Sequence, residues 1–131
     1  MLRISKLSDY ALIILAEMNE SDILSAKTLS EKSSIPFATT NKILKLLVNA
    51  HICTSGRGKN GGFSLAKPSN KISVLDVICA IDDKNSSFIE CSSPHSECQL
   101  KSYCKISTKM NIIDKEIYNV LSSKFLSDLL A

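Results

Sequence analysis

The sequence predicts a mainly α-helical fold with one small β-hairpin, and three observations support this prediction. Apolar residues recur at helical spacing through the first 50 residues, as in helices packed around one core. A glycine-rich turn containing Asn60-Gly61 then separates two short strand-like segments. A further helix is expected over residues 105–122, after a polar segment. The chain of 131 residues suits one domain, or one domain with an extension.

The first helix is expected over residues 5–19. Ser5 or Ser8 can cap its N-terminus, and Asp9 falls in or near the first turn, where a carboxylate interacts favourably with the helix dipole. Its apolar positions form a broad face: Leu7, Ala11, Ile14, Leu15 and Met18. A helix this apolar is expected to be buried on most sides, with a second subunit as one candidate cover.

Two short helices joined by a tight turn are expected next, over residues 25–33 and 36–50. Ser25 is the expected cap of the first, with a capping box from Thr28 to Glu31 as the alternative, and Pro36 should take the first helical position of the second. The second carries an apolar stripe: Ile43, Leu46, Leu47 and Ala50. Polar and basic residues lie off this stripe: Thr39, Asn41, Lys42, Lys45 and Asn49. This pattern is typical of a helix-turn-helix.

A basic hairpin follows, with strands expected over residues 51–55 and 62–66. Its turn carries Arg57 and Lys59 among glycines, which let a backbone approach phosphates closely, and Arg57 can enter a minor groove. His51 is expected to end the preceding helix in a left-handed conformation, and Cys53 to be a buried thiol. A hairpin in this place is the wing of a winged helix-turn-helix.

Charge is distributed unevenly along the chain. Residues 27–71 hold eight Lys or Arg and one acid, whereas the remainder holds eight Lys or Arg and twelve acids. A net charge of +7 in one segment of a chain whose total is +3 indicates a surface for a polyanion such as DNA. The alternative is a lysine-rich solvated surface.

A capped helix is expected over residues 74–82, followed by a polar segment with three cysteines. Ser73 is the expected cap, and Val77, Ile78 and Ile81 should face inward, with Cys79 also in the core. The three cysteines are spaced Cys91-x6-Cys98-x5-Cys104. Soft thiolates close together suggest a metal site that takes a fourth ligand from elsewhere, while free thiols or a disulfide are the alternatives. The spacing lacks the CxxC pairs of zinc fingers.

The C-terminal helix carries an apolar stripe that steps by four and three residues: Ile106, Met110, Ile113, Ile117 and Val120. Such a heptad seam predicts a dimer interface, with packing on the chain's own domain as the alternative. The expected organisation is a DNA-binding domain over residues 1–82, a metal-binding loop over 83–104, and a dimerisation helix and tail over 105–131. No run of apolar residues is long enough to span a membrane, no signal peptide is expected, and five cysteines then indicate a reducing cytoplasm.

The opening sequence from Met1 to Ala11, the wing Arg57-Gly58-x-x-Gly61-Gly62-Phe63 and the three-cysteine loop together resemble the iron–sulfur winged-helix regulators of bacteria, the IscR/NsrR type. The opening looks most like regulators of the SUF cluster-assembly operon. The resemblance covers nearly the whole chain and implies a homodimer that binds double-stranded operator DNA. The protein is not expected to be an enzyme, to bind a membrane or to take a small-molecule substrate.

The resemblance also implies the ligands of an iron–sulfur cluster, with 2Fe–2S favoured and 4Fe–4S as the alternative. Cys91, Cys98 and Cys104 match the cluster cysteines. IscR-like members take the fourth ligand from a His at the position of Ser107, so this chain departs from them. NsrR-like members use an Asp from the other subunit at the position of Asp9, and His95 is a weaker candidate.

The function that the resemblance implies is a repressor that senses cluster status and controls cluster-assembly genes. DNA contacts are expected from Thr39 and Asn41 at base edges, from Lys42 and Lys45 at phosphates, and from Arg57 and Lys59 in the wing. A nitric-oxide or redox sensor of the same family and a zinc-stabilised DNA-binding protein are the alternatives. A thiol enzyme is disfavoured, because neither His51 nor His95 sits in a catalytic pattern.

Overall fold

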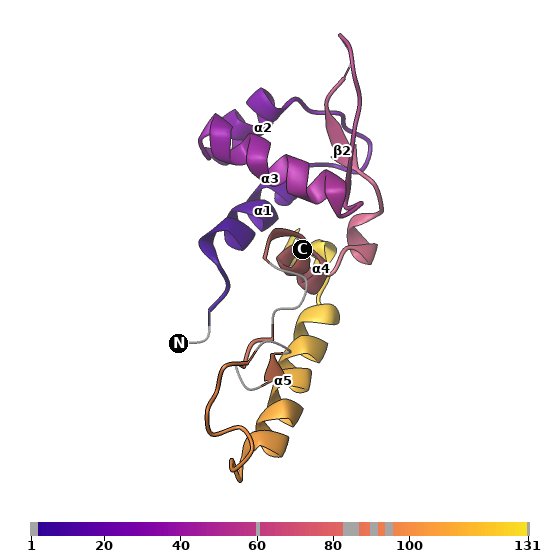
Figure 1. The fold of residues 1–131 in the computed structure, drawn as a ribbon. Helices are drawn as coiled ribbons and strands as arrows, with labels where there is room; N and C mark the ends of the chain where they lie inside the picture. Colours follow the sequence, from indigo (N-terminus) through magenta and orange to yellow (C-terminus); the bar gives the residue numbers. More distant parts are fainter. Residues whose placement is uncertain (1–2, 60, 83–86, 90–91, 94–95, 131) are drawn as a thin grey trace.

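The computed structural model describes residues 3–59, 61–82, 87–89, 92–93 and 96–130. Within them the elements follow in this order: α1 (Lys6–Ala16), α2 (Ala26–Ser33), α3 (Phe37–Asn49), β1 (Cys53–Ser55), β2 (Phe63–Leu65), the 3-10 turn η1 (Ser69–Lys71), α4 (Val74–Ile81), α5 (Ser107–Ser122) and α6 (Leu126–Leu130). The predicted fold class, mainly helical with one small wing, is confirmed. The predicted metal-binding loop, residues 83–104, is called the cysteine segment below. Figure 1 shows α5 and residues 96–104, the described end of that segment, extending away from the body formed by α1 to α4.

Helix α1 begins where the sequence predicts and ends earlier than residue 19. The Ser5 side chain accepts a hydrogen bond from the Ser8 backbone N–H at 3.2 Å, so Ser5 is the cap. At the other end Glu17 and Met18 donate to carbonyls three residues back, at 3.1 Å each, which tightens and closes the helix. Met18 stays in the core although it lies beyond the helix.

The turn between α2 and α3 is held by hydrogen bonds to one carbonyl. Ser34 ends α2 with a positive φ of 60°, and the Ile35 carbonyl then accepts from the hydroxyls of Ser30 and Thr40, at 2.5 and 3.3 Å. Pro36 precedes α3 as its cap residue, so the prediction that it takes the first helical position is wrong by one residue. Because the Ile35 side chain is buried beneath the turn, α2 and α3 are fixed to each other and to the core.

The core lies between α1, α3 and α4, and it corrects the predicted register of α3. The buried residues of α3 are Thr40, Ile43, Leu44 and Leu47, whereas Leu46 and Ala50 are half-buried. Apolar side chains occupy nearly every position from 43 to 48, so their spacing alone left two faces possible. The buried face follows from packing against α1 and α4.

The wing is a two-stranded antiparallel hairpin with Cys53 opposite Leu65 and Ser55 opposite Phe63. Both strands are shorter than predicted, and His51 adopts the expected positive φ of 60°. Leu24, which precedes α2, adds an isolated antiparallel bridge to Phe63, with N–H to carbonyl distances of 2.9 and 2.7 Å. This bridge fastens the base of the wing to the helix-turn-helix.

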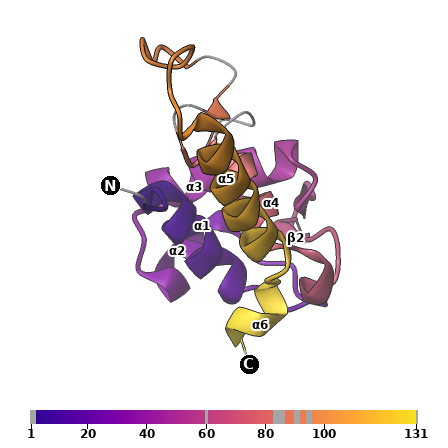
Figure 2. The same cartoon turned by 90° about the horizontal axis from the view of Figure 1, so that it is seen from below.

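The C-terminal residues return to the N-terminal body, which the sequence did not predict. The Val74 N–H donates to the Lys124 carbonyl and the Leu126 N–H donates to the Ile72 carbonyl, at 2.8 Å each. Leu126 is 1% exposed and belongs to the core. Figure 2 shows α5 running back toward the body and α6 at its end. No helix among the described residues is long and apolar enough to cross a bilayer.

Candidate nucleic-acid interface and cysteine segment

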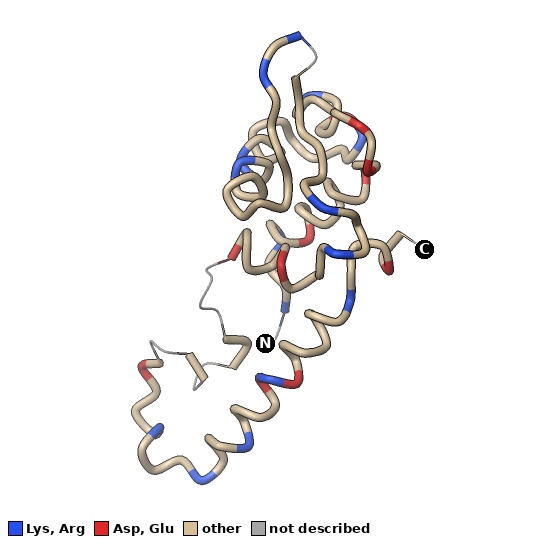
Figure 3. Tube along the Cα trace, turned by 90° about the vertical axis from the view of Figure 1, so that its right-hand side faces the viewer, with Lys and Arg blue, Asp and Glu red and all other residues tan. Residues whose placement is uncertain are grey.

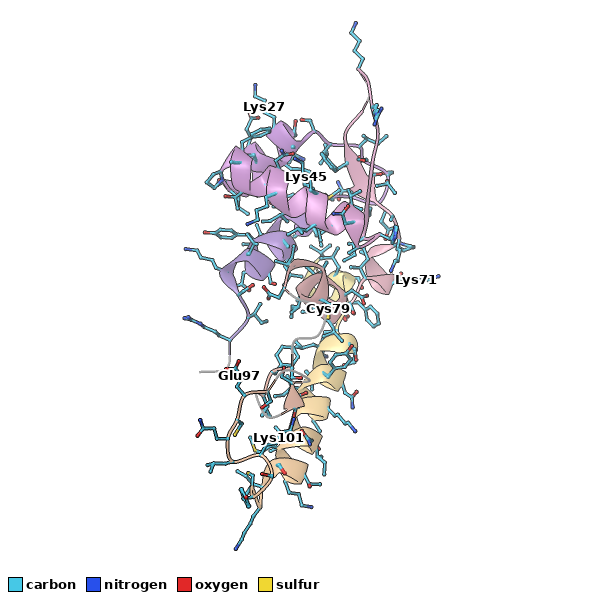
Figure 4. All side chains as sticks on the ribbon, in the orientation of Figure 1. Lys27, Lys45, Lys71, Cys79, Glu97 and Lys101 are labelled. Atoms are coloured by element: carbon cyan, nitrogen blue, oxygen red, sulfur yellow. The ribbon has the colours of Figure 1, made fainter. Side chains whose placement is uncertain are left out.

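The outward face of α3 is polar and basic. Ala38, Lys42, Lys45 and Asn49 are exposed and step by four, three and four residues, which places them on one side of the helix. Thr39 and Asn41 are half-buried and flank this stripe on its two sides. The two lysines are therefore the outermost charged groups of α3, and Figure 4 shows Lys45 on this helix.

Phe37, which no pattern in the sequence singled out, is 53% exposed at the first position of α3. It lies one helical turn before Asn41, so the two are neighbours on the helix surface. Its position directly after Pro36, at the start of the second helix of the helix-turn-helix, could have indicated that its ring is exposed. An exposed aromatic ring beside polar groups can make apolar contacts with a thymine methyl group.

The tip of the wing presents Arg57 and Lys59, both exposed. The Gly56 N–H donates to the Gly62 carbonyl at 2.8 Å, and the Gly61 N–H donates to the Gly58 carbonyl at 2.9 Å. A Cβ atom at residue 61 would approach the Gly56 carbonyl oxygen to 2.8 Å, so the turn requires glycine there. Figure 3 shows basic residues at this tip, at the end of the molecule opposite the cysteine segment.

Two of the three predicted cluster cysteines are described. Cys98 is exposed, Cys104 is half-buried, and neither forms a disulfide. Cys91 and the alternative ligand His95 lie outside the described residues. Soft, solvent-accessible thiols suit iron, so the donor chemistry fits the expected group. Among the described residues, however, no three His, Cys, Asp or Glu side chains gather as a metal site.

The other two cysteines differ from these in environment. Burial raises the pKa of the Cys53 thiol to about 12. Burial, and then the carboxylates of Asp76 and Asp82, raise the pKa of the Cys79 thiol. Both thiols therefore stay protonated near neutral pH and are poor metal ligands. The expectation that Cys79 lies in the core is corrected, because it is half-buried and lines a surface pocket of about 360 Å³ with His51, Lys67 and Asp76.

One polar face of α5 holds the cysteine segment. The Asp114 carboxylate accepts from the backbone N–H groups of Phe88 and Ile89, at 2.8 and 3.0 Å. Asn111, one turn earlier, accepts from the Ser92 hydroxyl. Ser107 donates its hydroxyl to the Cys104 carbonyl at 3.3 Å. Ser107 therefore supports the backbone of Cys104, a predicted ligand.

The predicted seam of α5 is largely uncovered. Ile106, Ile113 and Val120 are exposed, at 60%, 43% and 57%, while Met110 and Ile117 are half-buried. Leu100 and Tyr103 in the cysteine segment are also exposed, at 69% and 83%. No residue of α5 is buried within the described chain. An uncovered apolar surface of this extent is typical of a protein-protein interface.

Asp9 is exposed on the first turn of α1, and within the described part of the chain its carboxylate has no hydrogen-bond partner. Beside it, the hydroxyls of Ser5 and Ser8 donate to the Asp82 carboxylate at 2.8 to 3.0 Å. Asp82 is the last described residue before the cysteine segment. The first turn of α1 thus contacts the residue that follows α4 directly.

Known proteins resemble this chain over most of its length. Residues 4–131 match the Rrf2 family model, described as an iron-dependent transcriptional regulator. A Lactococcus lactis protein named as an HTH-type transcriptional regulator, YffB, is 38% identical over 81 residues, which are 62% of this chain and about half (52%) of YffB.

Two solved structures show the same fold. One is CymR, the global cysteine regulator of B. subtilis, with a TM-score of 0.76, 23% identity and coverage of 99% of this chain and 97% of CymR. The other is IscR of T. potens, with a TM-score of 0.70, 23% identity and coverage of 98% and 86%. At this level of identity the likeness extends to the fold alone.

Proposed function

Because the chain belongs to the Rrf2 family of transcriptional regulators, we propose that it binds operator DNA as a homodimer and that an iron–sulfur cluster sets its affinity for that DNA. The observation that carries the first part is the exposed stripe with Lys42 and Lys45 on α3, beside a basic wing. The family consists of regulators and not of enzymes, as the sequence predicted.

The proposed DNA contacts differ between α3 and the wing. We place α3 in the major groove, with Lys42 and Lys45 on phosphates and with Thr39, Asn41 and Phe37 beside base edges. Arg57 and Lys59, exposed at the tip of the wing, would reach the neighbouring backbone or minor groove. A regulator with these contacts works in the cytoplasm, where its DNA is.

The dimer is proposed from the uncovered seam of α5. Ile106, Ile113 and Val120 would be covered by the same helix of a second copy, as an isologous interface requires. Two copies would present two α3 helices to two half-sites, which is the usual arrangement for a helix-turn-helix regulator. The apolar surface of the cysteine segment would lie at the edge of the same interface.

Cys91, Cys98 and Cys104 would hold the cluster, which we propose to be 2Fe–2S, with 4Fe–4S as the alternative. Asp9 is the proposed fourth ligand, reaching across the dimer, because its carboxylate is exposed and without a partner among the described residues. A bound cluster would supply redox chemistry, and its loss or oxidation would change the coordination of these cysteines. The chain's own part is to hold the loop on α5 through Ser107, Asn111 and Asp114.

The regulated genes and the signal belong to the same proposal. The opening residues favour control of cluster-assembly genes of the SUF type, by repression. Sensing of nitric oxide or of redox state uses the same cysteines, and exposure of Cys98 to solvent would serve either signal. A zinc-stabilised protein would use these thiols too but would be colourless.

Iron and sulfide content of anaerobically reconstituted variants tests the cluster assignment. Replacing Cys98 with Ala is expected to remove bound iron, sulfide and visible absorbance, because one of three thiolate ligands is removed. Cys53→Ala is the matched control, since the pKa of that buried thiol is about 12, and it should retain all three signals. Full cluster content in Cys98→Ala, or its loss in Cys53→Ala, would refute the assignment.

A further inference from the structure

We propose that Asp82 is a positioning residue that couples the cysteine segment to the DNA-binding body, by holding the first turn of α1. This inference rests on the proposed function. Asp82 is the C-terminal cap residue of α4 and directly precedes the cysteine segment in the sequence. No sequence pattern pointed to it, because its partners lie 74 and 77 residues away.

The hydrogen bonds to Asp82 converge on one turn of helix. The Ser5 hydroxyl lies 2.9 and 2.8 Å from the two carboxylate oxygens, and the Ser8 hydroxyl donates to one of them at 3.0 Å. Ser8 is fully buried, so this carboxylate satisfies a hydroxyl that has little access to water. The negative charge also lies at the N-terminus of α1, where the helix dipole favours it.

Capping α1 does not by itself require Asp82. Ser5 already accepts the Ser8 N–H at 3.2 Å, and the Asp9 N–H already donates to the Ser5 carbonyl at 3.1 Å. The hydrogen bonds of the Asp82 carboxylate therefore hold the end of α4 against the start of α1. α1 in turn packs against α3, which carries the proposed DNA-reading face.

The same turn carries Asp9, the proposed cluster ligand. Ser5, Ser8 and Asp9 lie within five residues, so a shift of Asp82 would move the backbone that presents Asp9. When the cysteine segment gains or loses the cluster, a displacement of Asp82 would shift Ser5 and Ser8. Because these two residues belong to the start of α1, α1 would move with them and would displace α3. Without Asp82 the two ends could move independently.

Asp76 provides a matched control on the same helix. Its carboxylate accepts from the Ser73 N–H at 3.1 Å and closes a local capping box, with no bond to α1. Asp76→Ala and Asp82→Ala each remove a helix-end carboxylate and should both lower the melting temperature. Only Asp82→Ala should alter communication between the cysteine segment and DNA.

The test is the ratio of operator-DNA affinities, measured by fluorescence anisotropy, between cluster-loaded and cluster-free full-length dimer. Coupling of this kind typically changes affinity about 5- to 150-fold. We expect Asp82→Ala to bring the ratio close to one, Asp76→Ala to keep the wild-type ratio, and Ser8→Ala, which keeps the Ser5 cap, to be intermediate. Ser8→Ala carries the test where Asp82→Ala does not fold.

The outcomes separate the role of Asp82 from the proposed function. A wild-type ratio in both Asp82→Ala and Ser8→Ala would overturn the role of Asp82 while leaving the proposed function in place. Equal losses in Asp76→Ala and Asp82→Ala would also overturn it, since any carboxylate at a helix end would then serve. If the wild-type ratio itself is one, the proposed regulation fails, and the coupling fails with it.

Discussion

Replacing Leu126 with Ala is expected to lower the free energy of unfolding by about 2–5 kcal/mol, the usual cost of truncating a buried leucine. Leu126 is 1% exposed in the core, and its backbone N–H bonds the Ile72 carbonyl at 2.8 Å. The last helix of the chain is therefore part of the DNA-binding body. Denaturant unfolding followed by circular dichroism measures the change.

Leu129→Ala is the control for this substitution, because Leu129 lies in the same short helix and is 53% exposed. Truncation there should change the unfolding free energy by no more than about 0.5 kcal/mol. Similar values for the two variants would mean that α6 does not complete the core in solution.

The second large effect is expected on DNA binding. The double variant Lys42→Ala/Lys45→Ala should weaken operator binding on the order of a hundredfold at physiological salt, since up to about four phosphates per dimer would no longer be neutralised. Both lysines lie at the centre of the exposed face of α3. The slope of log affinity against log salt should fall by about 0.9 for each of these phosphates. Affinity measured over a salt series gives both values.

Lys101→Ala/Lys109→Ala is the matched control, with the same change in net charge. Both residues are exposed. Figure 4 shows Lys101 at the end of the molecule away from the wing, and Lys109 lies in the first turn of α5. This variant should keep the wild-type affinity and salt slope. An equal effect of the two pairs would indicate attraction by net charge alone and would remove α3 from the proposed interface.

Local signals in the sequence were sufficient for most helix boundaries. The predicted caps were Ser5 or Ser8, Ser25 with Thr28 as the alternative, and Ser73. Ser5, Ser25 and Ser73 each accept a backbone N–H three residues ahead. His51 has the predicted left-handed conformation. A cap or a left-handed turn is decided by residues within a few positions of each other, which is why such features can be read from the chain.

Features that depend on distant residues could not be read in this way. The bridge between Leu24 and Phe63, the return of Leu126 to the core and the hydrogen bonds of Asp82 and Asp114 all join segments far apart in the sequence. They follow from how the helices pack. The buried face of α3 was also predicted incorrectly, because apolar residues lie around most of this helix and its local sequence does not single out one face.

In the candidate site, too, the features set by local sequence were predicted and those set by distant contacts were missed. Exposure of Lys42, Lys45 and Arg57 agrees with their predicted place off the apolar stripe and on the wing. The support of the cysteine segment by the polar face of α5 was missed, because Ser107, Asn111 and Asp114 resemble ordinary surface residues until the loop is seen on them. Their helical spacing of four and three was the one available signal.

Regulation of DNA binding by a cluster is tested most directly by the affinity of the wild-type dimer for operator fragments selected from genomic DNA, with and without the reconstituted cluster at matched salt. We expect a coloured protein whose two forms differ in affinity by at least about fivefold. Cys98→Ala, treated in the same way, should behave as the cluster-free form. Equal affinity of the loaded and cluster-free wild-type protein would contradict regulation by a cluster.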